Sequence, residues 1–189
     1  MKFTGEYRIP APRQRVWEAL NDPEILRQAI PGCEEMKRIG DNAYEARVMA
    51  KVGPVRARFT GQVRLEDLNP PESYRLVGEG KGGAAGFARG GARVSLEEVD
   101  GGTLLRYEAD AEVGGKLAQL GSRLIQGTAK KMADDFFGRF SEIVSREVAP
   151  EAAPPPPPPP PAPAPLTARP AFWIVLAAVV LLLLWWLLR

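Results

Sequence analysis

A two-residue alternation of apolar and polar side chains dominates the chain between about residues 43 and 113. The clearest runs extend from Tyr44 to Val52, from Val55 to Leu65 and from Leu105 to Val113. Successive side chains of a β-strand point to opposite faces, so each run has one apolar face and one polar face. The pattern predicts antiparallel strands that cover a core on one side only, joined by the turn sequences GDN, NPP and DGG at residues 40–42, 69–71 and 100–102.

Helical periodicity flanks this region. Residues 2–9 predict a first strand, residues 12–20 and 22–30 predict two short helices, and residues 116–148 predict one long helix. The apolar stripe of the long helix consists of Leu117, Leu120, Leu124, Ile125, Thr128, Met132, Phe136, Phe140, Ile143 and Val144. We therefore expect an α+β fold of one strand, two short helices, about six further strands and a long helix that covers the apolar face of a curved sheet.

The composition changes abruptly near residue 149. Residues 1–148 look like one globular domain, whereas residues 149–170 are rich in proline and include the unbroken run from Pro154 to Pro161. Such a run favours polyproline II, which extends about 3.1 Å per residue, so this linker could hold the domain up to roughly 65 Å from its attachment point. A docking sequence for proline-binding domains is the alternative interpretation.

Residues 171–188 are uninterrupted apolar residues with tryptophans at both ends. As a helix they would extend roughly 27 Å, close to the thickness of about 30 Å of a bilayer's hydrocarbon core. The sequence predicts a single-pass C-terminal transmembrane helix. The N-terminus has no apolar signal segment, so we expect the globular domain on the cytoplasmic side of the cytoplasmic membrane.

Charge and residue types exclude several functions. The chain has 25 Lys and Arg against 23 Asp and Glu, a balance that gives no strong field for nucleic acid. It contains no histidine, which excludes imidazole bases and His-ligated metals. The single cysteine, Cys33, allows no internal disulfide and is interpreted as a structural thiol. We predict no catalytic residues, no metal site and no nucleic-acid partner.

The sequence GEGKGGAAGFARGG at residues 78–91 matches the spacing of a dinucleotide-binding fingerprint. That fingerprint requires a following helix, whereas the next residues alternate as a strand does, so we expect no nucleotide here. Gly78, Gly80 and Gly82 remove the side chains from one face of a strand. This favours either a surface hairpin or the mouth of an apolar cavity under the long helix. The candidate lining residues are Phe59, Gly61, Gly78, Gly80, Gly82, Phe87, Leu117, Leu120, Gly121, Leu124 and Thr128.

Three long stretches carry a family resemblance. They are PAPRQRVWEALNDPEILRQAIPGCE, VGPVRARFTGQVRLEDLNPPESYRLVGEGKGGAAGFARGGA and VGGKLAQLGSRLIQGTAKKMADDFF. Over about residues 1–145 the chain resembles the CoxG family of carbon monoxide dehydrogenase subunits, within the START-like (SRPBCC) helix-grip superfamily. The resemblance implies a long C-terminal helix that closes a curved antiparallel sheet over an apolar cavity. It also implies association with a molybdenum-containing hydroxylase, typically carbon monoxide dehydrogenase or a relative, at the cytoplasmic membrane.

The resemblance and the predicted anchor together lead to a functional hypothesis. We expect a non-catalytic, membrane-anchored adaptor that recruits a molybdenum hydroxylase and contacts membrane lipid. We expect no permanent cofactor, and a quinone or another lipid as the ligand of an occupied cavity. Two alternatives remain: a tether whose domain binds no ligand, and an enzyme that acts on a hydrophobic, polyketide-like substrate, because superfamily members bind lipids, isoprenoids or polyketides and some are enzymes.

Overall fold

The structure, a computed structural model, describes residues 1–148. The linker predicted at residues 149–170 and the transmembrane helix predicted at residues 171–188 lie outside the described residues. Within residues 1–148, no helix combines the length and the apolarity needed to cross a bilayer.

The chain begins with a strand and two short helices, as predicted. Strand β1 spans Lys2–Ile9, helix α1 spans Arg13–Leu20 and helix α2 spans Pro23–Ala29. Helix α2 starts sharply because the Asp22 side chain accepts hydrogen bonds from the backbone N–H groups of Glu24 and Ile25, at 2.8 Å and 3.4 Å. The proline at its first position has no N–H group that would need a partner there.

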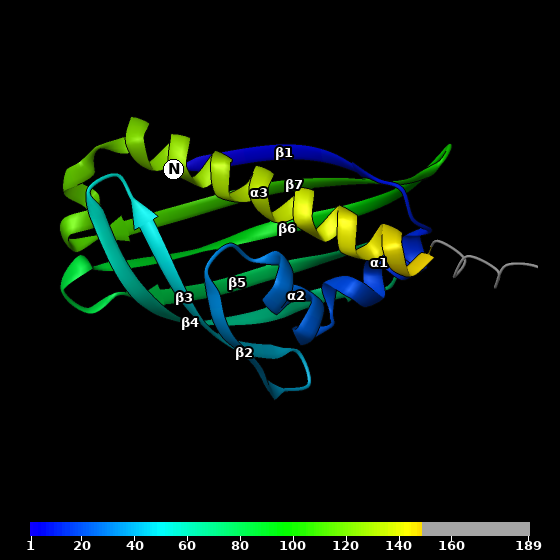
Figure 1. Ribbon diagram of the computed structural model, residues 1–189, viewed down its shortest axis with the longest axis horizontal. Coiled ribbons are helices and arrows are strands. Elements are labelled where there is room, and N and C mark those ends of the chain that lie inside the picture. Colours follow the sequence, from blue (N-terminus) through cyan, green and yellow to red (C-terminus); the bar gives the residue numbers. More distant parts are fainter. Residues whose placement is uncertain (149–189) are drawn as a thin grey trace, which may run out of the picture. The chain divides into compact units, whose positions relative to one another are not determined.

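Six further strands follow, which confirms the prediction from the alternating pattern. They are β2 (Cys33–Gly40), β3 (Ala43–Val52), β4 (Val55–Asn69), β5 (Ser73–Lys81), β6 (Phe87–Val99) and β7 (Gly102–Gly114). All paired neighbours are antiparallel, and the sheet has the order β1-β7-β6-β5-β4-β3-β2. Strand β5 therefore lies in the middle, and β1 and β2 form the two edges (Figure 1).

The predicted helix at residues 116–148 is wrong at its start. Residues Gly115–Leu120 form a 3-10 helix, and the long helix α3 begins only at Ser122 and continues to Val148. Gly121 separates the two because its φ of 82° lies in a region that a right-handed helix does not use. Leu117 and Leu120 thus belong to a different element from the rest of the predicted stripe.

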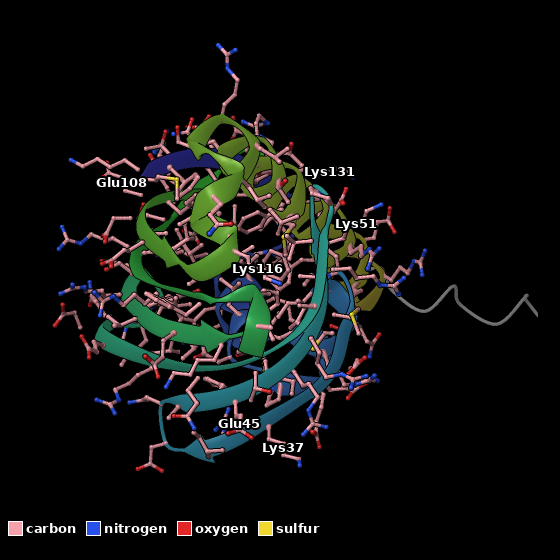
Figure 2. The ribbon with its side chains drawn as sticks, turned by 90° about the vertical axis from the view of Figure 1, so that its left-hand side faces the viewer. Lys37, Glu45, Lys51, Glu108, Lys116 and Lys131 are labelled. Atoms are coloured by element: carbon pink, nitrogen blue, oxygen red, sulfur yellow. The ribbon has the colours of Figure 1, made fainter. Side chains whose placement is uncertain are left out.

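Helix α3 lies across the concave side of the sheet (Figure 1). Seen from the end where β3 turns into β4, the sheet curls around an interior and α3 runs along one side of it (Figure 2). The fully buried core lies toward the other end of α3, where Ile9, Val16, Leu105, Phe140 and Val144 are all 0 % exposed. An ion pair between Arg15 and Glu147 also joins α1 to the end of α3. The helix is thus packed most tightly at its C-terminal half.

Candidate ligand-binding cavity

An apolar cavity of about 460 Å³ lies between the sheet and the middle of α3. Strands β4 to β7 contribute side chains at alternate positions, and α3 contributes side chains three and four positions apart. The lining residues are Phe3, Leu20, Leu26, Ile30, Pro31, Met36, Tyr44, Val63, Leu65, Tyr74, Leu76, Ala92, Val94, Leu105, Tyr107, Ala109, Ala129, Met132, Ala133, Phe136 and Phe137. None of them carries a charge.

Four small side chains explain why space remains at this place. Ala92 and Ala109 are on the sheet, and Ala129 and Ala133 are on α3. At the tightly packed end of the helix the corresponding positions are filled by Phe140 and Val144. Because a methyl group fills little of the distance between a helix and a sheet, the alanines leave the interior hollow where larger residues would close it.

None of the cavity residues predicted from the glycine-rich stretch lines this cavity. Leu120, Gly121, Leu124 and Thr128 instead border a separate open groove at the start of α3. Leu117 is buried, at 4 % exposure. Phe59, Gly61, Gly78, Gly80 and Gly82 lie on β4 and around the end of β5, where a Cβ on Gly82 would meet the Phe59 ring. A ligand-binding role for these residues stays a prediction.

Phe87 points away from the cavity. On β6, the buried side chains of Val94 and Leu96 point to the inner face of the sheet. Because side chains alternate along a strand, Phe87, seven residues before Val94, points to the outer face. Phe87 is 37 % exposed, and the guanidinium carbon of Arg89 lies 5.8 Å from the centroid of its ring. Phe87 therefore belongs to the outer surface.

The glycines of β5 and β6 permit the close approach of neighbouring strands. A Cβ on Gly78 would lie 2.8 Å from the carbonyl oxygen of Gln62 on β4. A Cβ on Gly90 would collide with the carbonyl oxygen of Asp110 and lie 2.9 Å from the Cα atom of Ala111 on β7. The glycines thus let the sheet curl tightly beside the cavity, and no helix that could bind a phosphate group follows them: Gly83–Ala85 is a single 3-10 turn before β6.

Three tyrosines line the cavity: Tyr107, which is a neighbour of Tyr7, and Tyr44 and Tyr74, which differ in their hydrogen bonding. The Tyr44 hydroxyl donates to the carbonyl oxygen of Asn21 at 3.1 Å and accepts from Nη2 of Arg38 at 3.3 Å. The Tyr74 hydroxyl forms no hydrogen bond with any residue that the structure describes, although Tyr74 is only 5 % exposed. Burial raises the pKa of Tyr74 above its usual value, so its hydroxyl stays protonated. The sequence pattern placed Tyr44 on an inward face but did not single out either hydroxyl.

A hydrogen-bonded cluster fastens α3 to the sheet beside the cavity. The Tyr7 hydroxyl donates to Oδ1 of Asp134 at 2.7 Å, and Nζ of Lys130 donates to Oδ2 at 2.9 Å. The hydrogen bond from Tyr7, followed by that from Lys130, lowers the pKa of Asp134, whereas burial and the bond to Asp134 raise the pKa of Tyr7. The Tyr7 ring stacks on the cavity residue Phe137 with 4.2 Å between ring centroids. The cluster therefore fixes one wall of the cavity.

The adjacent carboxylates of α3 and the cysteine are engaged in local contacts. Asp134 and Asp135 are paired with Lys130 and Lys131 on the surface of α3, so this adjacent pair acts as two separate ion pairs. Burial raises the pKa of the Cys33 thiol, whose Sγ atom donates to the carbonyl oxygen of Glu35 at 3.3 Å. No group of three or more metal-ligating side chains occurs among residues 1–148.

Solved structures share this architecture. A conserved protein from Geobacillus kaustophilus is 31% identical, with a TM-score of 0.74 over 78% of this chain and 97% of that chain. A protein from Rhizobium leguminosarum is 18% identical (TM-score 0.60, 77% and 95% covered), and one from Chromobacterium violaceum is 15% identical (TM-score 0.59, 76% and 96% covered). The latter two show the fold alone. A search among curated proteins finds no significant match.

A family model covers nearly all of the described residues. The model for the carbon monoxide dehydrogenase subunits called CoxG matches residues 5–145, a range that includes every cavity-lining residue except Phe3. The helix-grip arrangement of sheet and α3 agrees with the resemblance noted in the sequence. The chain therefore belongs to the CoxG family of carbon monoxide dehydrogenase subunits.

Proposed function

We propose that this chain is a non-catalytic accessory subunit that recruits a molybdenum-containing hydroxylase, of the carbon monoxide dehydrogenase kind, to the cytoplasmic membrane. We propose further that its cavity carries an apolar ligand such as a quinone. Membership of the CoxG family supports the accessory role. The uncharged cavity of about 460 Å³ is the observation that carries the ligand proposal.

The size and the lining of the cavity suit such a ligand. Pockets for small organic molecules commonly enclose about 300 to 1,000 Å³ and are lined mainly by apolar side chains with a few polar groups. Burying apolar surface contributes about 25 cal/mol per Å². A quinone ring and the first units of an isoprenoid chain would bury most of their surface here without placing a charge in the cavity.

The sequence beyond the described residues supports a place at the membrane. The apolar segment at residues 171–188 has the length of a membrane-spanning helix, and the proline-rich residues 149–170 would separate it from the domain. Electrons that leave a hydroxylase at the membrane need an acceptor that dissolves in lipid. A ligand-binding domain tethered to the bilayer would bring such an acceptor to the enzyme.

Extraction of the purified full chain tests the ligand proposal. Mass spectrometry of the organic extract should detect a quinone or another neutral lipid in stoichiometric amount. The substitution Ala109→Phe, which fills the cavity, should abolish this signal, whereas the same substitution at the exposed Ala118 should leave it unchanged. An empty cavity that takes up no quinone on incubation would reduce the function to that of a tether.

Deletion of residues 149–189 tests recruitment. The shortened chain and the hydroxylase should both move from the membrane fraction to the soluble fraction, while the affinity of the domain for its ligand stays unchanged. A hydroxylase that remains on the membrane after this deletion would contradict the recruiting role.

A further inference from the structure

The Tyr74 side chain occupies an unusual position in the cavity. It lies on β5, the central strand of the sheet, and is 5 % exposed. The rings of Trp17 and Tyr74 pack in a T-shaped arrangement, with 5.6 Å between centroids and an interplanar angle of 78°. Helix α1 and the sheet therefore hold the tyrosine ring in place.

Within the described part of the chain, the Tyr74 hydroxyl is a donor without a partner, on a residue that lines the cavity. Among residues 1–148, the only fully enclosed side-chain polar atom without a hydrogen-bond partner is Nε of Arg13. The Tyr74 hydroxyl also has no partner in this part of the chain, so it cannot be fully enclosed. Tyr74 lines the cavity, which makes its unpaired hydroxyl the candidate donor for a ligand bound there.

The surroundings define which acceptor fits this donor. No lysine, arginine, aspartate or glutamate lines the cavity, so a charged ligand group would lose its hydration without gaining a counter-ion. Arg38, which is bonded to the cavity residue Tyr44, also donates to the carbonyl oxygen of Asn21 and does not line the cavity itself. A neutral carbonyl oxygen satisfies the tyrosine hydroxyl and introduces no charge.

We propose that Tyr74 determines the specificity of the cavity by donating a hydrogen bond to a carbonyl oxygen of an uncharged and otherwise apolar ligand. The inference rests on the proposed function, because it requires that the cavity binds a ligand. It goes further in naming the residue that distinguishes a carbonyl compound from a hydrocarbon of the same shape. A hydrogen bond to the otherwise unpaired Tyr74 hydroxyl favours binding of the carbonyl compound, whereas the apolar contacts are the same for both compounds.

Two matched probes test this role. They are 2,3-dimethyl-1,4-naphthoquinone and 2,3-dimethylnaphthalene, and the two methyl groups prevent addition of the Cys33 thiol to the quinone ring. Binding to the full chain in lipid nanodiscs is measured by equilibrium dialysis, with protein-free nanodiscs correcting for partition into lipid. Tyr74→Phe should weaken binding of the quinone about fivefold to tenfold and leave binding of the hydrocarbon unchanged.

A spectroscopic measurement reports the same hydrogen bond directly. The carbonyl stretching band of the bound quinone should lie at lower frequency in the unaltered chain than in Tyr74→Phe. Tyr7→Phe serves as the control, because its hydroxyl is bonded to Asp134 and Tyr7 does not line the cavity. This control should leave the band unchanged, and any change in affinity should be equal for the two probes, because Tyr7 affects only the position of the cavity wall.

Each outcome decides a different question. Unchanged quinone affinity in Tyr74→Phe, or an equal loss for both probes, would overturn the role of Tyr74 and leave ligand carriage intact. If neither probe binds the unaltered chain, the carrier function and the inference both fail. The variant loses no intramolecular hydrogen bond, so its thermal unfolding should match that of the unaltered chain.

Discussion

Tyr7 connects an edge strand to the long helix through one hydrogen bond, whose contribution can be measured. Tyr7→Phe keeps the stacking on Phe137 and removes only the donor to Asp134. We expect a loss of about 1 kcal/mol in the free energy of unfolding at neutral pH, because the bond is to a charged group but lies near solvent. Urea unfolding followed by circular dichroism provides the measurement.

The same variant should show a defined pH dependence. The pKa of Asp134 is lowered in the folded chain, so its stabilising effect is complete above the unfolded pKa of about 3.9 and is lost as the pH falls through the lower folded value. The difference between the unaltered chain and Tyr7→Phe should therefore shrink as the pH falls below the unfolded pKa and through the lower folded pKa of Asp134. An equal difference at neutral and acidic pH would show that the carboxylate of Asp134 does not contribute.

Two glycines should respond in opposite ways to alanine. Gly90→Ala places a Cβ against the β7 backbone and should destabilise the fold by about 2 to 3 kcal/mol. The new Cβ of Gly127→Ala, in α3, would meet no atom within 4 Å apart from its own stretch of helix, and the higher helix propensity of alanine should stabilise the fold by up to about 1 kcal/mol. Chemical unfolding of both variants compares them, and equal effects would contradict the close approach of β6 and β7.

Sequence alone located some of these residues better than others. The alternation pattern placed Tyr44 on an inward face. The same alternation, continued along β6 from Val94, would have placed Phe87 on the outer face. The glycines drew attention to residues that do not line this cavity, because a missing side chain can mean either empty space or close backbone contact. Only the position of the neighbouring strand distinguishes the two.

Helix α3 combines a tightly packed half with a half that lies over the cavity. Phe140 is 0 % exposed in the core, whereas Met132 lines the cavity. Phe140→Ala should cost about 3 to 5 kcal/mol, and Met132→Ala about 1 kcal/mol or less, because Met132 already borders unfilled space and makes fewer contacts to lose. Thermal unfolding of the two variants measures the contrast. Similar losses would mean that the helix is packed evenly along its length.

The elements themselves were predictable where periodicity and turn residues agreed. The strands and the two short helices have the expected order because their apolar residues recur with a clear period. The start of the long helix was misplaced because Leu117 and Leu120 continue the helical spacing across Gly121. A repeat of apolar residues does not reveal that one glycine between them has left the helical conformation.

At the scale of the whole molecule, helix and sheet enclose a cavity because small residues face each other across the interior. The family resemblance predicted that a cavity of this kind exists, but the sequence did not identify Ala92, Ala109 and Ala133 as part of its cause. Alanine is common in helices and strands of any fold. Its effect depends on which alanines meet, and that follows from the register of the strands and the placement of α3.

The central position of β5 in the sheet determines which part of the molecule can move when a ligand enters the cavity. Three strands flank β5 on each side, so its backbone opens only after its neighbours have separated, whereas the first turns of α3 carry exposed residues such as Leu124. Amide hydrogens of β5 should exchange with deuterium more slowly than those of α3 near Leu124. The Tyr74 hydroxyl would then lie on the most slowly exchanging strand, and a ligand would enter the cavity when the first turns of α3 move briefly away from the sheet.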